Sequence, residues 1–376
     1  MKSMIVANEF IWPETGIGKK LINQHRALLE LTESCEMVRL KLDRGLCKRY
    51  AGDTPVDIFG TPKYGYIQAL FQYQGLLNYI KENEIGFLYI RYVHFANHRF
   101  LDFLRTMKEH GLTVVLEIPT YPYDNESVSK IDISRIKHFI ELIYREKLGR
   151  WIDAIVTFSD DEKIFGSRCI NISNAADPHT LPLSCEPGEC DHALHFVAVA
   201  NLAFWHGYDR LISSMGRHYR ERTNPVDIHF HLVGNGAELA GLKALAETQG
   251  VSRYVKFYGA LGGQELDRVF DLAHIGVDSL GRHRSGNRHN NSLKSKEYLM
   301  RGLPLIKSHL DHSIDDSGFQ FQVAAEDEPF PLESIAHWYR DNGFRRAAIR
   351  NYALAHFTWI KQMRHVLEHC AADTAH

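Results

Sequence analysis

Short apolar runs alternate with amphipathic stretches along almost the whole chain. In the first half they predict strands at residues 4–7, 37–42, 87–91, 114–118, 154–158 and 170–172, and helices at 19–31, 67–82 and 99–110. In the second half they predict strands around residue 196 and at 228–233, 255–258, 275–277 and 305–307, and helices up to about residue 219 and at 237–249, 264–273 and 294–301. A parallel sheet wrapped by helices is the economical arrangement for such alternation.

Residues 175–191 interrupt the alternation with a run of turn-forming residues, which is typical of a linker. The chain has 376 residues, more than one hydrophobic core normally serves, so two domains are expected. We predict a first domain over 1–180, a second over 181–350 and a helical tail over 351–376 that packs back on the first domain. Two doubly wound domains imply a cleft between them, where ligands usually bind.

Composition narrows the class of protein. With 44% hydrophobic and 24% charged residues, the chain has an ordinary globular composition, and its formal net charge of -2 argues against a general nucleic-acid binder. The six cysteines are scattered, which favours a reducing compartment over a disulfide framework or a zinc site. No apolar run approaches the roughly 20 residues of a membrane span, and the N-terminus has no signal-peptide pattern, so the sequence predicts a cytoplasmic protein.

Residues 281–297 contain the highest concentration of candidate binding residues in the chain. Asn291 or Ser292 can cap a helix, and the backbone amides of its first turn can hold a diphosphate. Glu297 lies one turn further on, and a carboxylate accepts hydrogen bonds from both hydroxyls of a ribose. Positive charge is supplied by Arg282, Arg284, Arg288 and Lys294. The alternative interpretation is a solvated basic surface beside an ordinary capped helix.

Three earlier turns follow predicted strands of the same half. The first strand stops at Asn201 and leads to Trp205-His206-Gly207, the second leads to Gly234-Asn235-Gly236, and the third to Phe257-Tyr258-Gly259. Glycine allows the backbone to turn sharply and to approach a ligand closely. A single Gly-x-Gly is common in α/β proteins without a ligand, so the order of the turns is more informative than any one of them.

Taken in order, these motifs resemble the donor domain of GT-B glycosyltransferases of family 4 (group 1), in particular the type that assembles bacterial capsule and lipopolysaccharide. The resemblance covers most of residues 193–310 and, more weakly, the first half. It implies an α/β GT-B fold, in which two doubly wound Rossmann-like domains face each other across a cleft and a C-terminal helix crosses back to the first. It also implies retention of anomeric configuration, a UDP-sugar or GDP-sugar donor, and no obligatory metal or other cofactor.

The resemblance implies a donor site in the second half, although three of its usual residues are replaced. The family's phosphate-binding arginine and lysine fall on Asn201 and His206, and the first glutamate of its Glu-x7-Glu motif falls on His289. We therefore expect Lys294 to contact the phosphate, and His206 to meet it either protonated or through its ring N–H. The implied donor-binding residues are Asn201, His206, Gly207, Gly234, Asn235, Tyr258, Gly259, Arg282, Arg284, Asn291, Ser292, Leu293, Lys294 and Glu297.

Acceptor-binding residues are expected after strands of the first half. The segment from Glu117 to Glu126 follows a strand and carries several carboxylates and phenols, while Pro119 stands where many relatives have a histidine. Glu117 is a weaker candidate because it lies nearer the strand. We assign catalysis to Glu297, Lys294, Asp124 and Glu126, and acceptor binding to Gly16, Gly18, His94, Tyr121 and Tyr123. The alternative for this loop is a rigid, proline-rich turn whose tyrosines pack.

Two other features allow more than one interpretation. Residues 135–150 form a basic amphipathic pattern, which is typical of a core-facing helix with a solvated face but also allows peripheral contact with the inner membrane. His229 and His231 alternate on one strand face, where a packed pair of imidazoles is favoured over a metal site.

The sequence thus predicts a retaining hexosyltransferase that moves a sugar from a nucleotide-sugar donor to a saccharide or lipid-linked acceptor in bacterial surface polysaccharide biosynthesis. Two alternatives stay open. One is a non-catalytic sugar-nucleotide binding or scaffold protein, and the other is a GT-B sugar-nucleotide 2-epimerase.

Overall fold

A computed structural model describes residues 1–13, 15–123, 133–186, 193–221 and 226–373. The chain divides into two compact units: unit 1 comprises Met1–Ser173 and Trp359–His376, and unit 2 comprises Asn174–Thr358. The predicted domain limits were 180 and 350, so the structure places the first division earlier and the second later. The division falls before the proline-rich segment at 175–186, which belongs to unit 2.

Among the described residues, unit 1 contains a nine-stranded sheet in the order β4-β3-β2-β1-β5-β6-β7-β9-β8. Its central strands are parallel, whereas β3, β4 and β8 pair antiparallel with their neighbours. The strands are β1 Lys2–Phe10, β2 Ser34–Asp43, β3 Leu46–Ala51, β4 Thr54–Ile58, β5 Phe87–Arg91, β6 Thr113–Ile118, β7 Ala154–Thr157, β8 Lys163–Ile164 and β9 Ser167–Asn171. The expected all-parallel sheet is therefore corrected at its edges, where the turn at Gly52, with φ of 58°, closes a hairpin.

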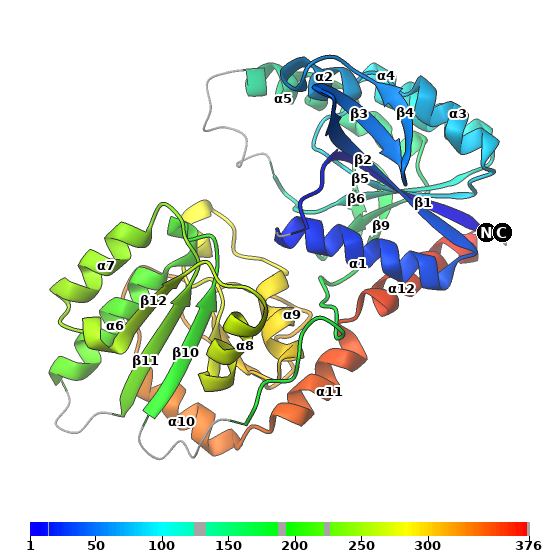
Figure 1. The fold of residues 1–376 in the computed structure, drawn as a ribbon. Helices are drawn as coiled ribbons and strands as arrows, with labels where there is room; N and C mark the ends of the chain where they lie inside the picture. The colour runs from blue at the N-terminus through cyan, green and yellow to red at the C-terminus, as the bar shows by residue number, and fades with distance from the viewer. Residues whose placement is uncertain (14, 124–132, 187–192, 222–225, 374–376) are drawn as a thin grey trace. The chain divides into compact units, whose positions relative to one another are not determined.

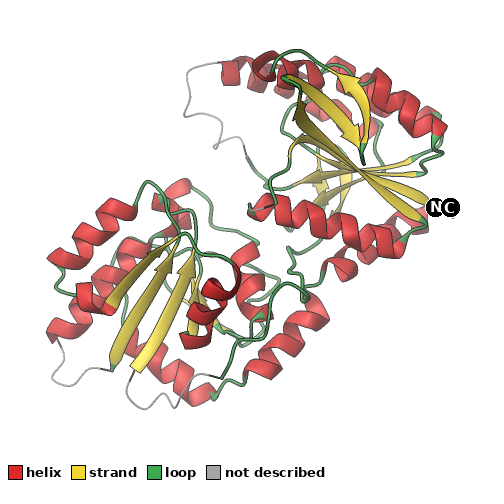
Figure 2. Ribbon diagram, viewed as in Figure 1, coloured by secondary structure: helices red, strands yellow, loops and turns green. Residues whose placement is uncertain are grey.

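Helices cover both faces of this sheet (Figure 2). They are α1 Gly16–Leu31, α2 Pro62–Ala69, α3 Gln74–Glu82, α4 His98–Glu109, α5 Ile133–Tyr144 and α12 Trp359–Asp373, with a 3-10 helix at Arg145–Arg150 after α5. The single helix expected at 67–82 is wrong. The fully buried Arg49 guanidinium donates to the carbonyls of Ala69 and Gln72, so it replaces the helical hydrogen bonds at the break.

The C-terminal helix α12 lies alongside α1 and completes unit 1, as Figure 1 shows. The Gln362 side-chain oxygen accepts a hydrogen bond of 2.9 Å from the Ser173 amide. The expected return of the last helix to the first domain is therefore confirmed.

The described part of unit 2 has a six-stranded parallel sheet in the order β12-β11-β10-β13-β14-β15. The strands are β10 Ala193–Val199, β11 Asp227–Val233, β12 Val255–Gly259, β13 Ile275–Val277, β14 Leu305–Lys307 and β15 Gln320–Gln322. The helices are α6 Tyr208–Glu221, α7 Leu239–Thr248, α8 Gly263–Leu272, α9 Leu293–Met300, α10 Leu332–Asn342 and α11 Arg346–His356. Alternate residues of β10 enter different cores: Phe196 packs in one and Val197 in the other, so both faces of the sheet are covered.

Candidate functional site

The loops after β10, β11 and β12 are joined by backbone hydrogen bonds at the carboxyl edge of the unit 2 sheet. The Leu202 amide donates to the Asn235 carbonyl at 2.7 Å, and the Gly234 amide donates to the Gly259 carbonyl at 2.7 Å. A Cβ on Gly234 would lie 1.8 Å from the Ala200 carbonyl oxygen. The structure thus brings together the predicted donor residues of these loops, and the packing of one loop on the next requires a glycine at 234.

The turn at residues 205–207 is fixed on both sides. Phe204–His206 forms a single 3-10 turn in which His206 Nδ1 accepts a hydrogen bond of 3.1 Å from the Ala203 amide. Gly207 has φ of 65°, and a Cβ there would lie 2.5 Å from the Gly281 backbone nitrogen. The Leu280 amide donates to the His206 carbonyl at 2.7 Å. The turn is therefore held tightly against the start of the basic loop.

The protonation state of His206 follows from this position. Burial, reinforced by the positive charge of Lys294, lowers the pKa of His206 to about 3. Because Nδ1 accepts from the backbone, the hydrogen of the neutral ring is on Nε2. In the ligand-free protein at neutral pH the His206 ring is therefore neutral, and Nε2–H is the hydrogen-bond donor that it can offer to a phosphate.

Lys294 lies in the first turn of α9 and is held by a carboxylate that the sequence did not single out. Its Nζ lies 3.1 Å from Asp278 Oδ1 and 3.2 Å from Ser279 Oγ. Asp278 is fully buried; burial raises its pKa, but Lys294, His309 and the hydroxyls of Ser295 and Ser292 outweigh this and hold the pKa well below its usual range. Asp278 follows β13 directly, and its place at a strand end is the signal that could have identified it.

Arg284 is paired with two carboxylates. Its NH1 and NH2 lie 2.8 Å from the two carboxylate oxygens of Asp209, and its Nε lies 2.6 Å from Asp327 Oδ1. It also donates to the Phe204 carbonyl at 3.0 Å. Arg284 therefore fastens the basic loop to the turn at 205–207, and its contact with a phosphate stays a prediction. Arg282 is close enough to His206 to contribute to the lowering of its pKa.

The start of α9 also differs from expectation. Ser292 occupies the N-cap position, but its side chain makes no capping hydrogen bond. Asn291 is engaged by Asn174, whose amide donates to Asn291 Oδ1 at 2.8 Å and whose Nδ2 donates to the Asn291 carbonyl at 2.6 Å. The first-turn amides, beginning with Leu293, thus have no side-chain cap at the same edge as Lys294, which suits an anion. Glu297 is half-buried one turn further on.

The expected acceptor residues of unit 1 are mostly packed. Tyr123 is 2% exposed, donates its hydroxyl to Glu141, and stacks on His94 with a ring-centroid distance of 4.0 Å. Tyr121 meets the Tyr123 ring edge-on. The assignment of Tyr123 to direct acceptor binding is therefore wrong, and the alternative of a turn with packed tyrosines holds for it. Asp124 and Glu126 lie outside the described residues.

The packing of the protein explains Gly18, in the first turn of α1, and also Glu117. A Cβ on Gly18 would lie 1.9 Å from the Trp12 carbonyl oxygen, and Thr15 Oγ1 accepts a hydrogen bond of 3.0 Å from the Gly18 amide. Gly16 is the first, exposed residue of the helix. Glu117 is fully buried, which excludes it from direct contact with an acceptor.

The imidazoles at 229 and 231 are part of a larger cluster. His195 stacks on His229 at 4.7 Å between centroids, and its Nδ1 lies 2.8 Å from His231 Nε2. His231 Nδ1 lies 2.7 Å from the hydroxyl of Tyr258, a predicted donor-site residue. The rings are paired with one another and with a phenol, as expected for packed imidazoles.

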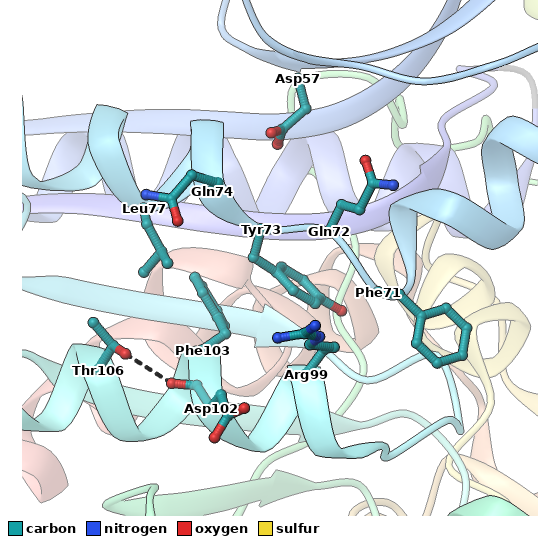
Figure 3. A pocket seen from close by; sticks show the side chains of 10 residues that line it. All are labelled: Asp57, Phe71, Gln72, Tyr73, Gln74, Leu77, Arg99, Asp102, Phe103 and Thr106. Carbon is teal, nitrogen blue, oxygen red and sulfur yellow. Dashed lines mark hydrogen bonds between the residues drawn. The ribbon is translucent and has the colours of Figure 1, made fainter.

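Unit 1 also contains a pocket of about 640 Å³ that includes none of the predicted site residues. Figure 3 shows it between the α2–α3 connection, α3 and α4, with Tyr73 at its centre and Arg99 below. Tyr73 stacks on Phe103 at 4.9 Å, and the Arg49 guanidinium lies 5.1 Å from its ring centroid. The pocket thus overlies the break between α2 and α3.

The fold defines the class of protein: two doubly wound α/β units with a returning C-terminal helix form the GT-B architecture. Sucrose-phosphate synthase from Thermosynechococcus elongatus has a similar structure, with a TM-score of 0.63 and 13% identity over 99% of both chains. The lipopolysaccharide outer core galactosyltransferase WaaB gives a TM-score of 0.61 and 12% identity, over 98% of this chain and 99% of its own. The catalytic domain of starch synthase IV from Arabidopsis thaliana, bound to ADP and acarbose, gives a TM-score of 0.61 and 10% identity, over 100% of this chain and 98% of its own.

Sequence comparison finds a family match in the second unit. Residues 193–335 match the family model described as Glycosyl transferases group 1, whereas no curated protein matches the chain. The resemblance to group 1 glycosyltransferases is therefore confirmed for residues 193–335 and the GT-B fold for the chain, which together support sugar transfer as the activity. No helix in the described parts of the chain is long and apolar enough to cross a membrane.

Proposed function

We propose that the protein is a retaining glycosyltransferase that moves a sugar from a UDP-sugar or GDP-sugar to a hydroxyl of a saccharide or lipid-linked saccharide in bacterial surface polysaccharide biosynthesis. One observation carries the proposal: Lys294 is fixed by buried Asp278 in the first turn of α9, close enough to His206 to depress its pKa. A cation, a neutral imidazole donor and uncapped helix amides meet at one sheet edge, in the unit that matches the glycosyltransferase family.

In this mechanism the site stabilises the departing diphosphate. Lys294 and Arg282 supply positive charge, the α9 amides and His206 Nε2 donate hydrogen bonds, and Glu297 binds the ribose hydroxyls. These groups are fixed before the reaction, by Asp278 for Lys294 and by the Ala203 amide for His206. Preorganised donors of this kind often make the largest single contribution to catalysis. Because side chains supply the charge, the proposal invokes no metal ion.

The first experiment identifies the donor. Because a ligand that binds only the folded state raises the melting temperature, a panel of UDP, GDP, ADP and CMP sugars is screened by thermal shift. The best donor is then incubated with the wild-type protein, Lys294→Ala and Glu297→Ala, and release of nucleotide is measured. We expect Lys294→Ala to lower kcat/KM by about 100-fold or more. Lys163→Ala, an exposed lysine of unit 1, is the control and should retain full activity.

The products separate the alternatives. Donor binding without nucleotide release in the wild-type protein would support a scaffold. Isomerised donor in the absence of an acceptor would support a 2-epimerase. Release of nucleotide that persists unchanged in both variants would contradict the proposed site. Retention is tested by the anomeric configuration of the transferred sugar.

The membrane contact is proposed on the surface of α5. Ile136 and Phe139 are each 65% exposed and Ile143 is 47% exposed on this helix, and exposed Lys147 and Arg150 follow it. Apolar side chains beside cations suit an anionic lipid surface, and a lipid-linked acceptor would be presented there. In sedimentation with phosphatidylglycerol vesicles, Phe139→Glu should lose binding, whereas Ile58→Glu, at a 64% exposed position on β4, should not. Equal binding by the two variants would contradict the proposal.

A further inference from the structure

A cluster of four charged residues lies at the carboxyl edge of the unit 1 sheet. It comprises Glu9 at the end of β1, Lys20 on α1, Arg91 at the end of β5 and Glu117 on β6, and we call it the Glu117 quartet. Lys20 Nζ and Arg91 NH1 each lie 3.0 Å from Glu117 Oε1, and Arg91 Nε lies 2.6 Å from Glu9 Oε1. The four residues form one chain of ion pairs from Lys20 to Glu9.

The inner part of the quartet is closed to solvent. Glu117 is fully buried, and Lys20 and Arg91 are 5% and 9% exposed. The second carboxylate oxygen of Glu117 accepts hydrogen bonds of 2.6 Å from Tyr89 and from Gln24. Lys20 Nζ also lies 3.6 Å from the centroid of the Phe158 ring. Every inner charge is therefore held in one position.

Fold stability alone does not account for this arrangement. Replacement of a buried ion pair by well-packed apolar residues is often neutral or stabilising, so a buried network is weak evidence for a purely stabilising role. Charged groups that are buried, paired and placed at the ligand-binding edge of an α/β sheet are candidates for function. The question is which member of the quartet a ligand can reach.

Glu9 is the residue of the Glu117 quartet that a ligand can reach. Its side chain is 28% exposed, whereas the side chains of the other three residues are buried. Arg91 engages Oε1, and Oε2 has no hydrogen-bond or ion-pair partner among the residues that the structure describes. Glu9 also precedes the loop that leads into α1. The predicted acceptor residues Gly16 and Gly18 lie in the first turn of that helix. The quartet thus presents one fixed carboxylate oxygen at the sheet edge.

We propose that Glu9 binds the acceptor: its Oε2 accepts a hydrogen bond from a hydroxyl of the acceptor saccharide, while Arg91, Glu117 and Lys20 position it. An ionised carboxylate only accepts hydrogen bonds, so it selects a hydroxyl and repels a phosphate. The residue therefore favours the uncharged, hydroxyl-bearing part of an acceptor. This inference rests on the proposed glycosyltransferase function.

The test separates acceptor binding from donor chemistry. Transfer from the identified donor to a panel of p-nitrophenyl glycosides is measured for the wild-type protein, Glu9→Leu, Glu9→Gln and the control Glu109→Gln, which changes a 61% exposed glutamate of the same unit. We expect Glu9→Leu to raise the KM for the acceptor about 10- to 100-fold. The KM for the donor and the rate of donor hydrolysis should stay unchanged. Glu9→Gln keeps an acceptor oxygen and should have an intermediate effect.

The outcomes are distinguishable. An unchanged acceptor KM in Glu9→Leu, or equal increases in the acceptor and donor KM, overturns the inference and leaves the proposed function intact. A wild-type protein that hydrolyses the donor but glycosylates no member of the panel also counts against the inference, since one carboxylate does not demand a particular sugar. A wild-type protein that neither binds nor consumes any donor refutes the proposed function itself.

Discussion

The substitution Glu117→Gln tests whether the quartet is held together as the structure indicates. Burial raises the pKa of Glu117, but the charges of Lys20 and Arg91 and hydrogen bonds from Tyr89 and Gln24 outweigh it and lower the pKa from 4.5 to about 2. At about 1.4 kcal/mol for each tenfold change, the folded state favours the ionised carboxylate by about 3 kcal/mol. Removal of one partner from a buried ion pair typically costs about 3–5 kcal/mol. Both estimates give the same magnitude.

The assay is equilibrium unfolding in urea, with hydrogen exchange of β5 and β6 to assign the loss to unit 1. Glu117→Gln should lower the free energy of unfolding by about 3 kcal/mol. Glu109→Gln should change it by less than about 0.5 kcal/mol, because that carboxylate is largely exposed and its pair with Arg105 is screened by solvent. The double variant Lys20→Met/Glu117→Gln should recover part of the loss, because one of the two uncompensated cations is then absent.

The sign of the pH dependence provides a second check. Because the folded pKa of Glu117 is depressed, its contribution is complete above pH 4.5 and is lost as the pH falls towards about 2. The slope of stability against pH should therefore be smaller in Glu117→Gln over this range. A loss below about 1 kcal/mol in Glu117→Gln, with no effect of adding Lys20→Met, would refute the reasoning, since it would mean that the cations find other partners.

Three further predictions concern unit 2. Burial and the neighbouring imidazoles lower the pKa of His231 from 6.5 to about 3, so stability should fall by up to about 1.4 kcal/mol per pH unit below 6.5, and His231→Gln should flatten this slope in calorimetry. Gly234→Ala should cost about 3 kcal/mol or more in the same assay, because Gly234 has φ of 130° and the added Cβ meets a backbone oxygen, whereas Gly241→Ala, with open space around it, should not destabilise the unit. His206→Lys removes the acceptor for the Ala203 amide and should cost about 1 kcal/mol, yet tighten donor binding in calorimetric titration; unchanged donor affinity would make the turn purely structural.

The strands of the parallel cores could be predicted closely from sequence. Those expected at 87–91, 275–277 and 305–307 match β5, β13 and β14 in full, because a strand covered on both faces is a continuous apolar run with sharp limits. The break between α2 and α3 could not be predicted. It depends on hydrogen bonds from Arg49 on β3 to the carbonyls of Ala69 and Gln72, which lie 20 and 23 positions away. Local periodicity contains no information about such a distant donor.

The same limit applied to the site. The glycine turns and the basic loop were visible because they are contiguous motifs. The partners that set their chemistry were not, since Asp209 lies 75 positions from Arg284, and Ser279, which contacts Lys294 together with Asp278, lies 15 positions from it. Tyr123 shows the converse: its residue type and place after a strand suggested a ligand contact, but only the packing against His94 and Glu141 reveals that the ring is buried.

Both units pair a buried carboxylate with a lysine, but the charge that this arrangement leaves exposed differs in sign. In each, a buried carboxylate at or just after the carboxyl end of a parallel strand holds a lysine from a neighbouring helix: Glu117 holds Lys20, and Asp278 holds Lys294. In unit 2 the lysine side chain is 20% exposed, so the edge offers a cation, which suits a diphosphate. In unit 1 the lysine is closed off, and the ion-pair chain continues through Arg91 to end on a carboxylate, which suits a hydroxyl. Under the proposed function, this difference in the charge that reaches the surface separates the donor-binding edge from the acceptor-binding edge.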